Sequence, residues 1–273
     1  MTSINTNLSS LNAQRNLTKS SGELSTSMQR LSSGLRVNSA KDDAAGMSIA
    51  TKMDAQIRGM SQASRNANDG ISMIQTADGA LSNISDALQR MRELAVQGAN
   101  ATNGTSEWSN IDTEMKALNT EIGRIASDTK FNGTALLAAT AVSKDIQVGA
   151  DSGQKITVSF GANTAYAGLA SSAVAVSDVS TASSAIAAID DALKALNTER
   201  SSLGTAQNRM GYAISNLATN IENQSAAKSR IHDTDYAAET SKLSRSQILQ
   251  QAGTAMLAQA NSAPNSVMSL LRG

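Results

Sequence analysis

A regular three- and four-residue spacing of apolar side chains in the last third of the chain constrains the fold more than any other feature. The series is interrupted at Arg200 and Gln207, and it otherwise reads Ile186, Ile189, Leu193, Leu196, Leu203, Met210, Ile214, Leu217 and Ile221. Strands alternate with a period of two, whereas this spacing holds over about five heptads and is typical of a coiled coil. With a rise of about 1.5 Å per residue, a helix over residues 182–231 would be roughly 75 Å long.

Two upstream stretches repeat this pattern. The first seam contains Ile74, Ala77, Leu81, Ile84, Leu88, Met91 and Ala95, and a shorter second seam contains Ile111, Met115, Leu118, Ile122 and Ile125. We expect the first helix to continue through Asp69-Gly70, because the periodicity resumes on either side of that pair. Helices with one apolar face are stable when they pack side by side, so the three seams predict an antiparallel bundle closed by loops.

The composition favours a thin helical assembly over a thick core. Only 2% of the 273 residues are aromatic, one is proline, and the apolar residues are mostly Ala, Leu, Ile and Met, which suit helices. The formal net charge is zero and no basic patch contains interleaved aromatic residues, so nucleic acid is not an expected partner. The longest apolar runs are far shorter than a membrane span requires, so we expect no membrane insertion.

The sequence contains neither cysteine nor a typical secretory signal. The chain has no cysteine, which excludes disulfides and thiolate metal sites. The N-terminal sequence "MTSINTNLSSLNAQRNL" lacks the basic and continuous apolar regions of a cleaved secretory signal.

Turn-forming residues indicate where the helices end. Gly34 is a plausible helix stop, and Ser39 with Asp42 three residues later resembles a capping box at the next helix start. Residues 97–107 predict a loop between the first and second bundle helices, and the Asn-Gly pair in residues 128–137 ends the second one.

The middle of the chain has a different period. Within residues 144–160, apolar residues alternate on both sides of Gly-Ala-Asp-Ser-Gly, which predicts a β-hairpin. Residues 161–184 are rich in Ala, Ser, Thr and Val without a sustained period, and we interpret them as a surface loop.

The two ends share a character. Residues 1–37 and 236–271 hold amphipathic patterns with few charges; their apolar residues include Ile4, Leu8, Leu11, Leu24, Met28, Leu31 and Leu35 at one end and Leu249, Met256, Leu257, Val267, Leu270 and Leu271 at the other. Neither end can bury its seam alone, so each is expected to be disordered in the monomer and to pair with the other end or with further copies. A repeated head-to-tail contact that does not close into a ring builds a helical filament.

The sequence offers little for catalysis or metal binding. His232 is the only histidine, and the neighbouring Asp233 and Asp235 point in different directions along a helix, whereas a metal site needs converging ligands. No Ser-His-Asp or HExxH arrangement stands out. We therefore expect no enzyme activity and no cofactor, and we interpret this stretch as a helix start with Asp233 or Thr234 as the N-cap.

Several motifs together resemble those of one family. They are "INTNLSSLNAQRNL", "QRLSSGLRVNSAKDDAAGMSIA", "NDGISMIQTADGAL", "LQRMRELAVQ", "FNGTALL", "RMGYAISNLATNIENQSAAKSRIHDTDYAAET" and "ILQQAGTAMLAQANSAPNSVMSLLR". Their identity and order resemble bacterial flagellin at both ends and in the flanking helices. The short middle resembles a minimal form that lacks large outer domains.

The resemblance implies a mainly α fold: an elongated antiparallel bundle with a small β-hairpin and terminal helices that pair on assembly. It places residues 1–40 and 236–273 in an inner tube. It places residues 41–143 and 180–235 in a rod-like bundle, and residues 144–179 in the hairpin and surface loop.

The resemblance also implies a function. A flagellin is the structural subunit of the extracellular flagellar filament for swimming, exported by the flagellar type III apparatus without signal cleavage. Its implied partners are further copies of itself, an export chaperone on the C-terminal segment, the filament cap and the hook-associated proteins. A hook–filament junction protein of the same superfamily is the alternative. A chemoreceptor-type coiled-coil hairpin fits less well, because the predicted β-hairpin and loop interrupt the middle.

The stretch "ALQRMRELAVQGAN", residues 87–100, has two apolar stripes. Leu88, Met91 and Ala95 fit a buried seam. Arg90, Leu94 and Gln97 form a second stripe that we expect to face outward, with Arg90 preset by i,i+4 and i,i+3 contacts to Asp86 and Glu93.

The same stretch resembles the flagellin segment that a vertebrate Toll-like receptor detects. By that resemblance the receptor-facing residues are Gln89, Arg90, Glu93, Leu94 and Gln97, with Glu114 on the second helix. A solvated helix face with one incidental leucine remains the alternative interpretation.

Overall fold

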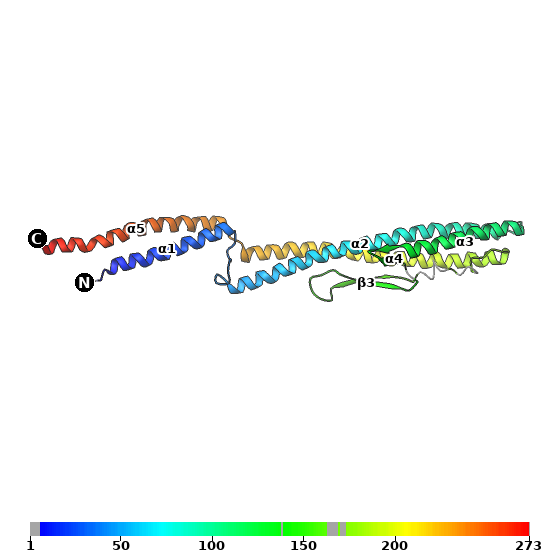
Figure 1. The fold of residues 1–273 in the computed structure, drawn as a ribbon, viewed down its shortest axis with the longest axis horizontal. Helices are drawn as coiled ribbons and strands as arrows, with labels where there is room; N and C mark the ends of the chain where they lie inside the picture. The colour runs from blue at the N-terminus through cyan, green and yellow to red at the C-terminus, as the bar shows by residue number, and fades with distance from the viewer. Residues whose placement is uncertain (1–5, 138, 163–168, 170–172, 273) are drawn as a thin grey trace. The chain divides into compact units, whose positions relative to one another are not determined.

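The computed structural model describes residues 6–137, 139–162, 169 and 173–272, with side chains up to residue 262. These residues form two compact units, one made of Met1–Ala55 with Asn223–Gly273 and the other of Gln56–Glu222. Two long helices, α2 (Ala44–Gly98) and α4 (Val179–His232), contribute to both units (Figure 1). Within the described ranges, no helix is long and apolar enough to cross a membrane.

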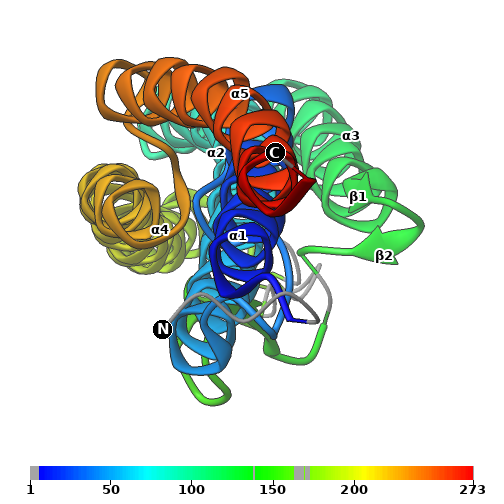
Figure 2. The same ribbon diagram turned by 90° about the vertical axis from the view of Figure 1, so that its left-hand side faces the viewer.

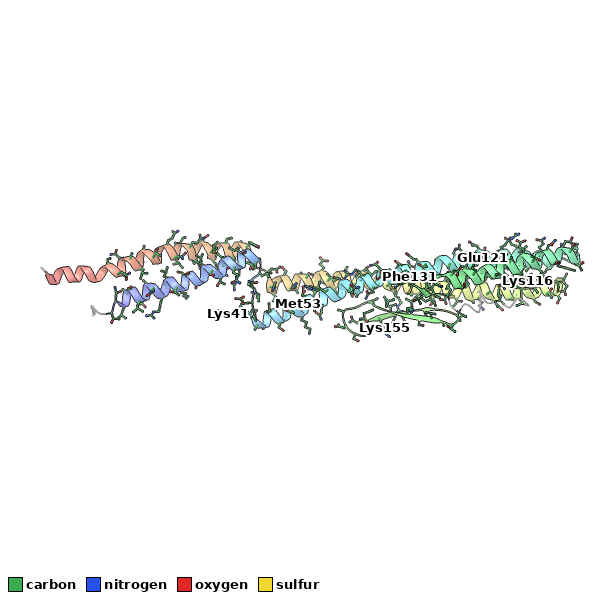
Figure 3. The ribbon with its side chains drawn as sticks, in the orientation of Figure 1. Lys41, Met53, Lys116, Glu121, Phe131 and Lys155 are labelled. Atoms are coloured by element: carbon green, nitrogen blue, oxygen red, sulfur yellow. The ribbon has the colours of Figure 1, made fainter. Side chains whose placement is uncertain are left out.

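In the unit formed by residues 56–222, α2, α3 (Thr105–Asp128) and α4 pack around one apolar core. The predicted seams are confirmed: Leu81, Leu88, Met115 and Ile189 are fully buried, and α2 runs unbroken through Gly70. The outer face of α3 is charged, and Lys116 and Glu121 point away from the bundle (Figure 3). Each fully buried aliphatic side chain contributes about 1.5–3 kcal/mol, so a seam of Leu, Ile and Met stabilises the unit with little aromatic bulk.

The start of α2 differs from the predicted capping box. The helix begins at Ala44, and Asp43 is its cap, accepting a hydrogen bond from the Gly46 amide at 2.8 Å. Asp42 instead accepts hydrogen bonds from Ser39, at 2.9 Å from both its amide and its hydroxyl, and so closes the preceding turn. The spacing of Ser39 and Asp42 therefore marks a turn before the helix and not its first residue.

The corner between α2 and α3 is closed by the only tryptophan of the chain. The predicted loop is confirmed, since α2 ends at Gly98 and α3 begins at Thr105. The half-buried Trp108 donates a hydrogen bond from its indole nitrogen to the Gly98 carbonyl at 2.8 Å. This bond satisfies a carbonyl at the end of α2, where the helix itself supplies no donor.

A small hairpin that the sequence did not predict follows α3. Strands β1 (Lys130–Phe131) and β2 (Thr134–Ala135) pair antiparallel. The turn between them places Asn132 at φ 46° and Gly133 at φ 77°, the left-handed region that tight hairpins require. The predicted Asn-Gly turn is thus confirmed, and the strands are too short for an alternating pattern to show.

The second hairpin, β3 (Val142–Gln147) and β4 (Lys155–Phe160), confirms the predicted one, with Ile146 opposite Ile156. Its inner residues Val158 and Phe160 are fully buried in the core of the bundle.

The surface loop predicted for residues 161–184 is wrong in part. Val174 and Val176 are buried. α4 begins at Val179, earlier than predicted, and the preceding residue Asp178 accepts a hydrogen bond from the Thr181 amide at 2.8 Å. Two valines two residues apart are enough to cover the edge of the core. So short a segment shows no sustained hydrophobic period in the sequence, which is why it resembled an irregular loop. The rest of that prediction, at residues 163–168 and 170–172, lies outside the described residues.

In the other unit, α1 (Leu8–Ser33) and α5 (Tyr236–Arg272) lie side by side, as two views show (Figures 1 and 2). α1 ends at the predicted Gly34, which has φ 74° and donates its amide hydrogen to the Arg30 carbonyl at 2.8 Å. The cap of α5 is Asp235, one or two residues later than predicted, because its carboxylate accepts the amides of Ala237 and Ala238 at 2.9 and 3.1 Å.

Candidate assembly and recognition surfaces

The contact between α1 and α5 buries small and polar side chains alongside leucines. Ser20, Ser27, Glu239 and Ser246 are each no more than 5% exposed. Small residues let two helices approach closely, and a Cβ added at Gly253 would already lie 3.2 Å from the side chain of Leu17. The seam between the two helices is therefore mixed, with buried serines and a glutamate alternating with half-buried leucines such as Leu24 and Leu31.

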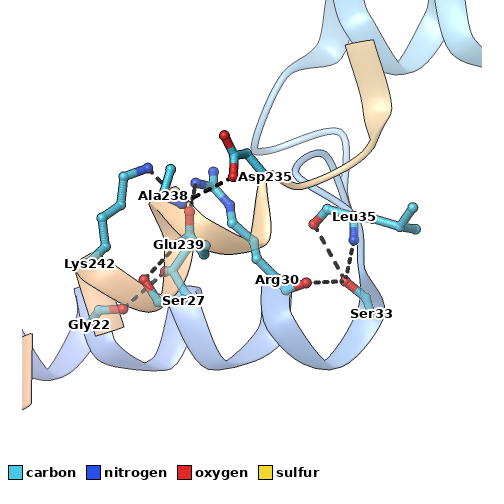
Figure 4. A network of polar contacts seen from close by, with 10 residues as sticks. Gly22, Ser27, Arg30, Ser33, Leu35, Asp235, Ala238, Glu239 and Lys242 are labelled. Atoms are coloured by element: carbon cyan, nitrogen blue, oxygen red, sulfur yellow. Dashed lines mark hydrogen bonds and ion pairs between the residues drawn. The ribbon is translucent and has the colours of Figure 1, made fainter. Parts of the chain in front are cut away.

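One carboxylate organises this seam (Figure 4). Glu239 accepts a hydrogen bond of 2.7 Å from the Ser27 hydroxyl, and its other oxygen lies 3.2 Å from the Lys242 ammonium and 3.9 Å from the Arg30 guanidinium. Burial alone raises the pKa of Glu239, but the hydrogen bonds from Ser27 and Lys242 and the charges of Lys242 and Arg30 outweigh it and hold that pKa below its ordinary value. The buried group thus stays ionised.

The apolar residues predicted for the terminal helices are divided between exposed and half-buried positions. Leu8, Leu11, Met28, Leu249 and Met256 are between 44% and 64% exposed. A second set is half-buried, and it comprises Leu24, Leu31, Leu35 and Leu257. Ile4 lies outside the described residues, as do the side chains of Val267, Leu270 and Leu271. The paired helices therefore present apolar side chains outward.

Exposed apolar side chains are concentrated in this unit. Eight of the ten large hydrophobic side chains that are exposed in the described residues belong to it, and only Val96 and Tyr212 belong to the other. A concentration of exposed apolar side chains on one unit indicates an interaction site.

A second candidate surface lies on α2 and α3, at the residues predicted to face a receptor. Gln89, Arg90, Glu93, Gln97 and Glu114 are all exposed. The Arg90 guanidinium lies 3.0 Å from the Glu114 carboxylate and 3.1 Å from that of Glu93. The hydrogen bonds with Glu114 and then Glu93 raise the pKa of Arg90, so this cluster presents a fixed cation between two anions.

The outward position predicted for Leu94 is wrong. Leu94 is 3% exposed and belongs to the apolar core with Met115. Because α3 packs on the same side of α2, this helix buries two stripes, and the exposed aliphatic residue of this stretch is Val96, at 51%. Arg90 reaches toward α3, and the predicted contact with Asp86 is not among the ion pairs of the described residues.

The described residues offer no arrangement suited to metal chemistry. Among them, no group of three or more His, Asp and Glu side chains is placed to hold a metal ion. His232 has its Nδ1 atom 3.8 Å from the Asp233 carboxylate. One imidazole beside one carboxylate falls short of the three or four ligands that metal sites use.

Comparison with known proteins agrees with this architecture. Residues 4–142 match the bacterial flagellin N-terminal helical region, and residues 186–271 match the bacterial flagellin C-terminal helical region. A flagellin of Halalkalibacterium halodurans is 48% identical and one of Xenorhabdus nematophila is 46% identical, each alignment covering 98% of this chain and 99% of the relative.

A solved structure extends the comparison to three dimensions. The crystal structure of Bacillus cereus flagellin has a TM-score of 0.52 and 34% identity, covering 60% of this chain and 94% of that one. The helical bundle, the small sheets and both matched regions lead to one conclusion: the chain belongs to the bacterial flagellin family, the structural subunits of the flagellar filament.

Proposed function

We propose that this chain polymerises into the filament through the outward apolar faces of α1 and α5. The observation that carries this proposal is the outward position of Met28 and Leu249, which remain exposed although the helices already bury Ser27 and Glu239 between them. Water-exposed Leu and Met side chains gain about 1.5–3 kcal/mol each when a neighbour covers them. A neighbour that brings the same surface in a head-to-tail contact leaves a fresh surface for the next copy.

Seeded growth tests this assignment. Leu249→Ser with Met256→Ser removes two side chains that are 48% and 64% exposed, so the monomer keeps its fold. We expect the critical concentration for elongation to rise about a hundredfold, since two residues lose about 1.5 kcal/mol each. The matched control is Val96→Ser with Tyr212→Ser, two exposed apolar residues of the other unit. An equal loss of growth in both double variants contradicts the assignment to α1 and α5.

A hook–filament junction protein is the alternative within the superfamily. The near-complete overlap with flagellins over 98% of this chain favours the subunit that elongates. Purified protein added to filament fragments should extend them into long filaments visible by electron microscopy. A cap that stops after one layer of subunits would support the junction protein instead.

For export, we propose passage of the unfolded chain through the flagellar type III apparatus, with a chaperone on the C-terminal segment and with the filament cap and hook-associated proteins as later partners. The exposed apolar residues of α5, such as Ile248 and Met256, support this because they need cover before assembly. Mass spectrometry of protein recovered outside the cell should find residues 1–40 still attached. An N-terminal truncation would contradict export without cleavage.

For recognition, we propose that the monomer activates the vertebrate flagellin-sensing Toll-like receptor through Gln89, Arg90, Glu93, Gln97 and Glu114. Leu94 supports this surface from beneath, since it is buried. Arg90→Ala should lower reporter-cell activation by at least about tenfold, the scale of an interface arginine. Arg92→Ala is the matched control, because Arg92 is similarly exposed and pairs with Asp190 instead. Equal activation by the wild type and Arg90→Ala contradicts the proposal.

A further inference from the structure

Four peptide bonds in this chain join Asn or Asp to glycine. They are Asp69-Gly70, Asp78-Gly79, Asn103-Gly104 and Asn132-Gly133. Such pairs form cyclic succinimides readily, because glycine has no Cβ to hinder attack of its backbone nitrogen on the preceding side-chain carbonyl carbon. The sequence alone predicts equal reactivity for the two Asn-Gly pairs, whereas the local structure predicts different reactivities.

The two Asp-Gly pairs are held by α2. Both lie inside the helix Ala44–Gly98, where each amide nitrogen is committed to the carbonyl four residues earlier. Asp78 is also paired with Arg200, at 2.8 Å. Cyclisation there requires the helix to open.

In Asn103-Gly104, both reacting groups are hydrogen-bonded. The Asn103 side-chain amide donates to the Gln97 carbonyl at 2.7 Å. The Gly104 amide, which is the attacking nitrogen, donates to the Glu107 carboxylate at 3.0 Å. Both hydrogen bonds must break before the ring can close.

Asn132-Gly133 is free at both groups. The pair forms the exposed two-residue turn between β1 and β2. In the part of the chain that the structure describes, no hydrogen bond involves the Asn132 side chain or the Gly133 amide. Each flanking strand is two residues long, and so short a hairpin opens locally at low free-energy cost.

We propose that Asn132 is the site of spontaneous deamidation in this protein. The Gly133 nitrogen loses its proton and bonds to the Asn132 side-chain carbonyl carbon, and the side-chain nitrogen leaves as ammonia. Water then adds to one of the two carbonyls of the succinimide. The ring opens either to aspartate or to isoaspartate, in which the backbone runs through the former side chain.

The modification changes the turn. Both products carry a new negative charge, and isoaspartate adds a methylene group to the main chain. The pairing of Phe131 with Thr134 leaves room for two residues of ordinary length. Leu136 and Leu137, which follow β2 directly, are fully buried, so the strain falls where the chain enters the core of the bundle.

Peptide mapping by mass spectrometry tests the proposal on the full-length protein. During incubation in mildly alkaline buffer, Asn132 should deamidate at least about tenfold faster than Asn103, because two hydrogen bonds hold the latter. In concentrated urea the two rates should converge. Glu107→Ala should raise the rate at Asn103 and leave that at Asn132 unchanged. Equal rates in the folded wild type, or an unchanged ratio in urea, would overturn the proposal.

Discussion

The Glu239 carboxylate is buried, and neighbouring groups compensate its negative charge. Ser27 donates to it at 2.7 Å, and Lys242 and Arg30 supply positive charge. A buried anion is tolerated only with partners of this kind. Hydrophobic periodicity could not have found this residue, because a glutamate on a mixed helix face looks solvated until its neighbour on the other helix is known.

The lowered pKa of Glu239 gives the α1–α5 pair a pH dependence. The ordinary value for this carboxyl is 4.5, and the folded value lies below it. Its contribution to stability is therefore fully present above about pH 4.5 and is lost as the pH falls through the folded pKa. Ser27→Ala removes the main stabilising hydrogen bond, so we expect hydrogen exchange in assembled filaments to show α1 and α5 opening at a higher pH.

Ser20→Ala is the control for that experiment. Ser20 is equally buried in the seam, but its hydroxyl donates to the Leu17 carbonyl of its own helix. A shift of the same size in both variants would show that packing, and not the Glu239 charge, sets the pH response.

Leu94 and Val96 provide a second residue-scale test. Leu94→Ala leaves a cavity in the core and should lower the free energy of unfolding by about 2–5 kcal/mol. Val96→Ala changes an exposed side chain and should lower it by less than about 0.5 kcal/mol. Urea unfolding followed by circular dichroism measures both. Similar values for the two variants would contradict the burial of Leu94.

At the scale of elements, the sequence predicts the helices better than the faces they use. The seams of α2, α3 and α4 are correct because each of these helices packs against an apolar neighbour. The seam of α1 and α5 departs from this rule, since buried serines share it with half-buried leucines while other leucines and methionines face outward. Periodicity finds an amphipathic helix but does not say whether its apolar face is covered within the chain or by another copy.

The heptad pattern of α4 is interrupted at Arg200. Arg200 occupies a seam position and pairs with Asp78 at 2.8 Å, while the Asp78 side chain is 46% exposed. Arg200→Leu restores the apolar seam and leaves Asp78 hydrated, so the free energy of unfolding should rise by about 1 kcal/mol. Asn197→Leu, at an exposed position on the same helix, should change it little. A destabilised Arg200→Leu variant in thermal unfolding would show that the ion pair is needed for packing.

At the scale of the whole molecule, the functional division of the chain remains a prediction. Deletion of residues 1–40 or of residues 236–273 should abolish filament growth, because either change removes one helix of the α1–α5 pair. The core of residues 56–222 has its own apolar cluster and should remain helical and unfold cooperatively. Filament formation by either deletion variant, seen by electron microscopy, would disprove the role of the pair.

The hydrogen bond from Trp108 to Gly98 gives the chain an internal optical reporter. Because the chain has a single indole, tryptophan emission reports only on the corner between α2 and α3. Helical signal in the far ultraviolet instead sums over every helix, α1 and α5 included. Ordering of the chain ends during filament growth is therefore expected to change the circular dichroism signal and to leave the tryptophan emission spectrum unchanged. The two signals thus distinguish ordering of the ends from any change at the α2–α3 corner without an attached dye.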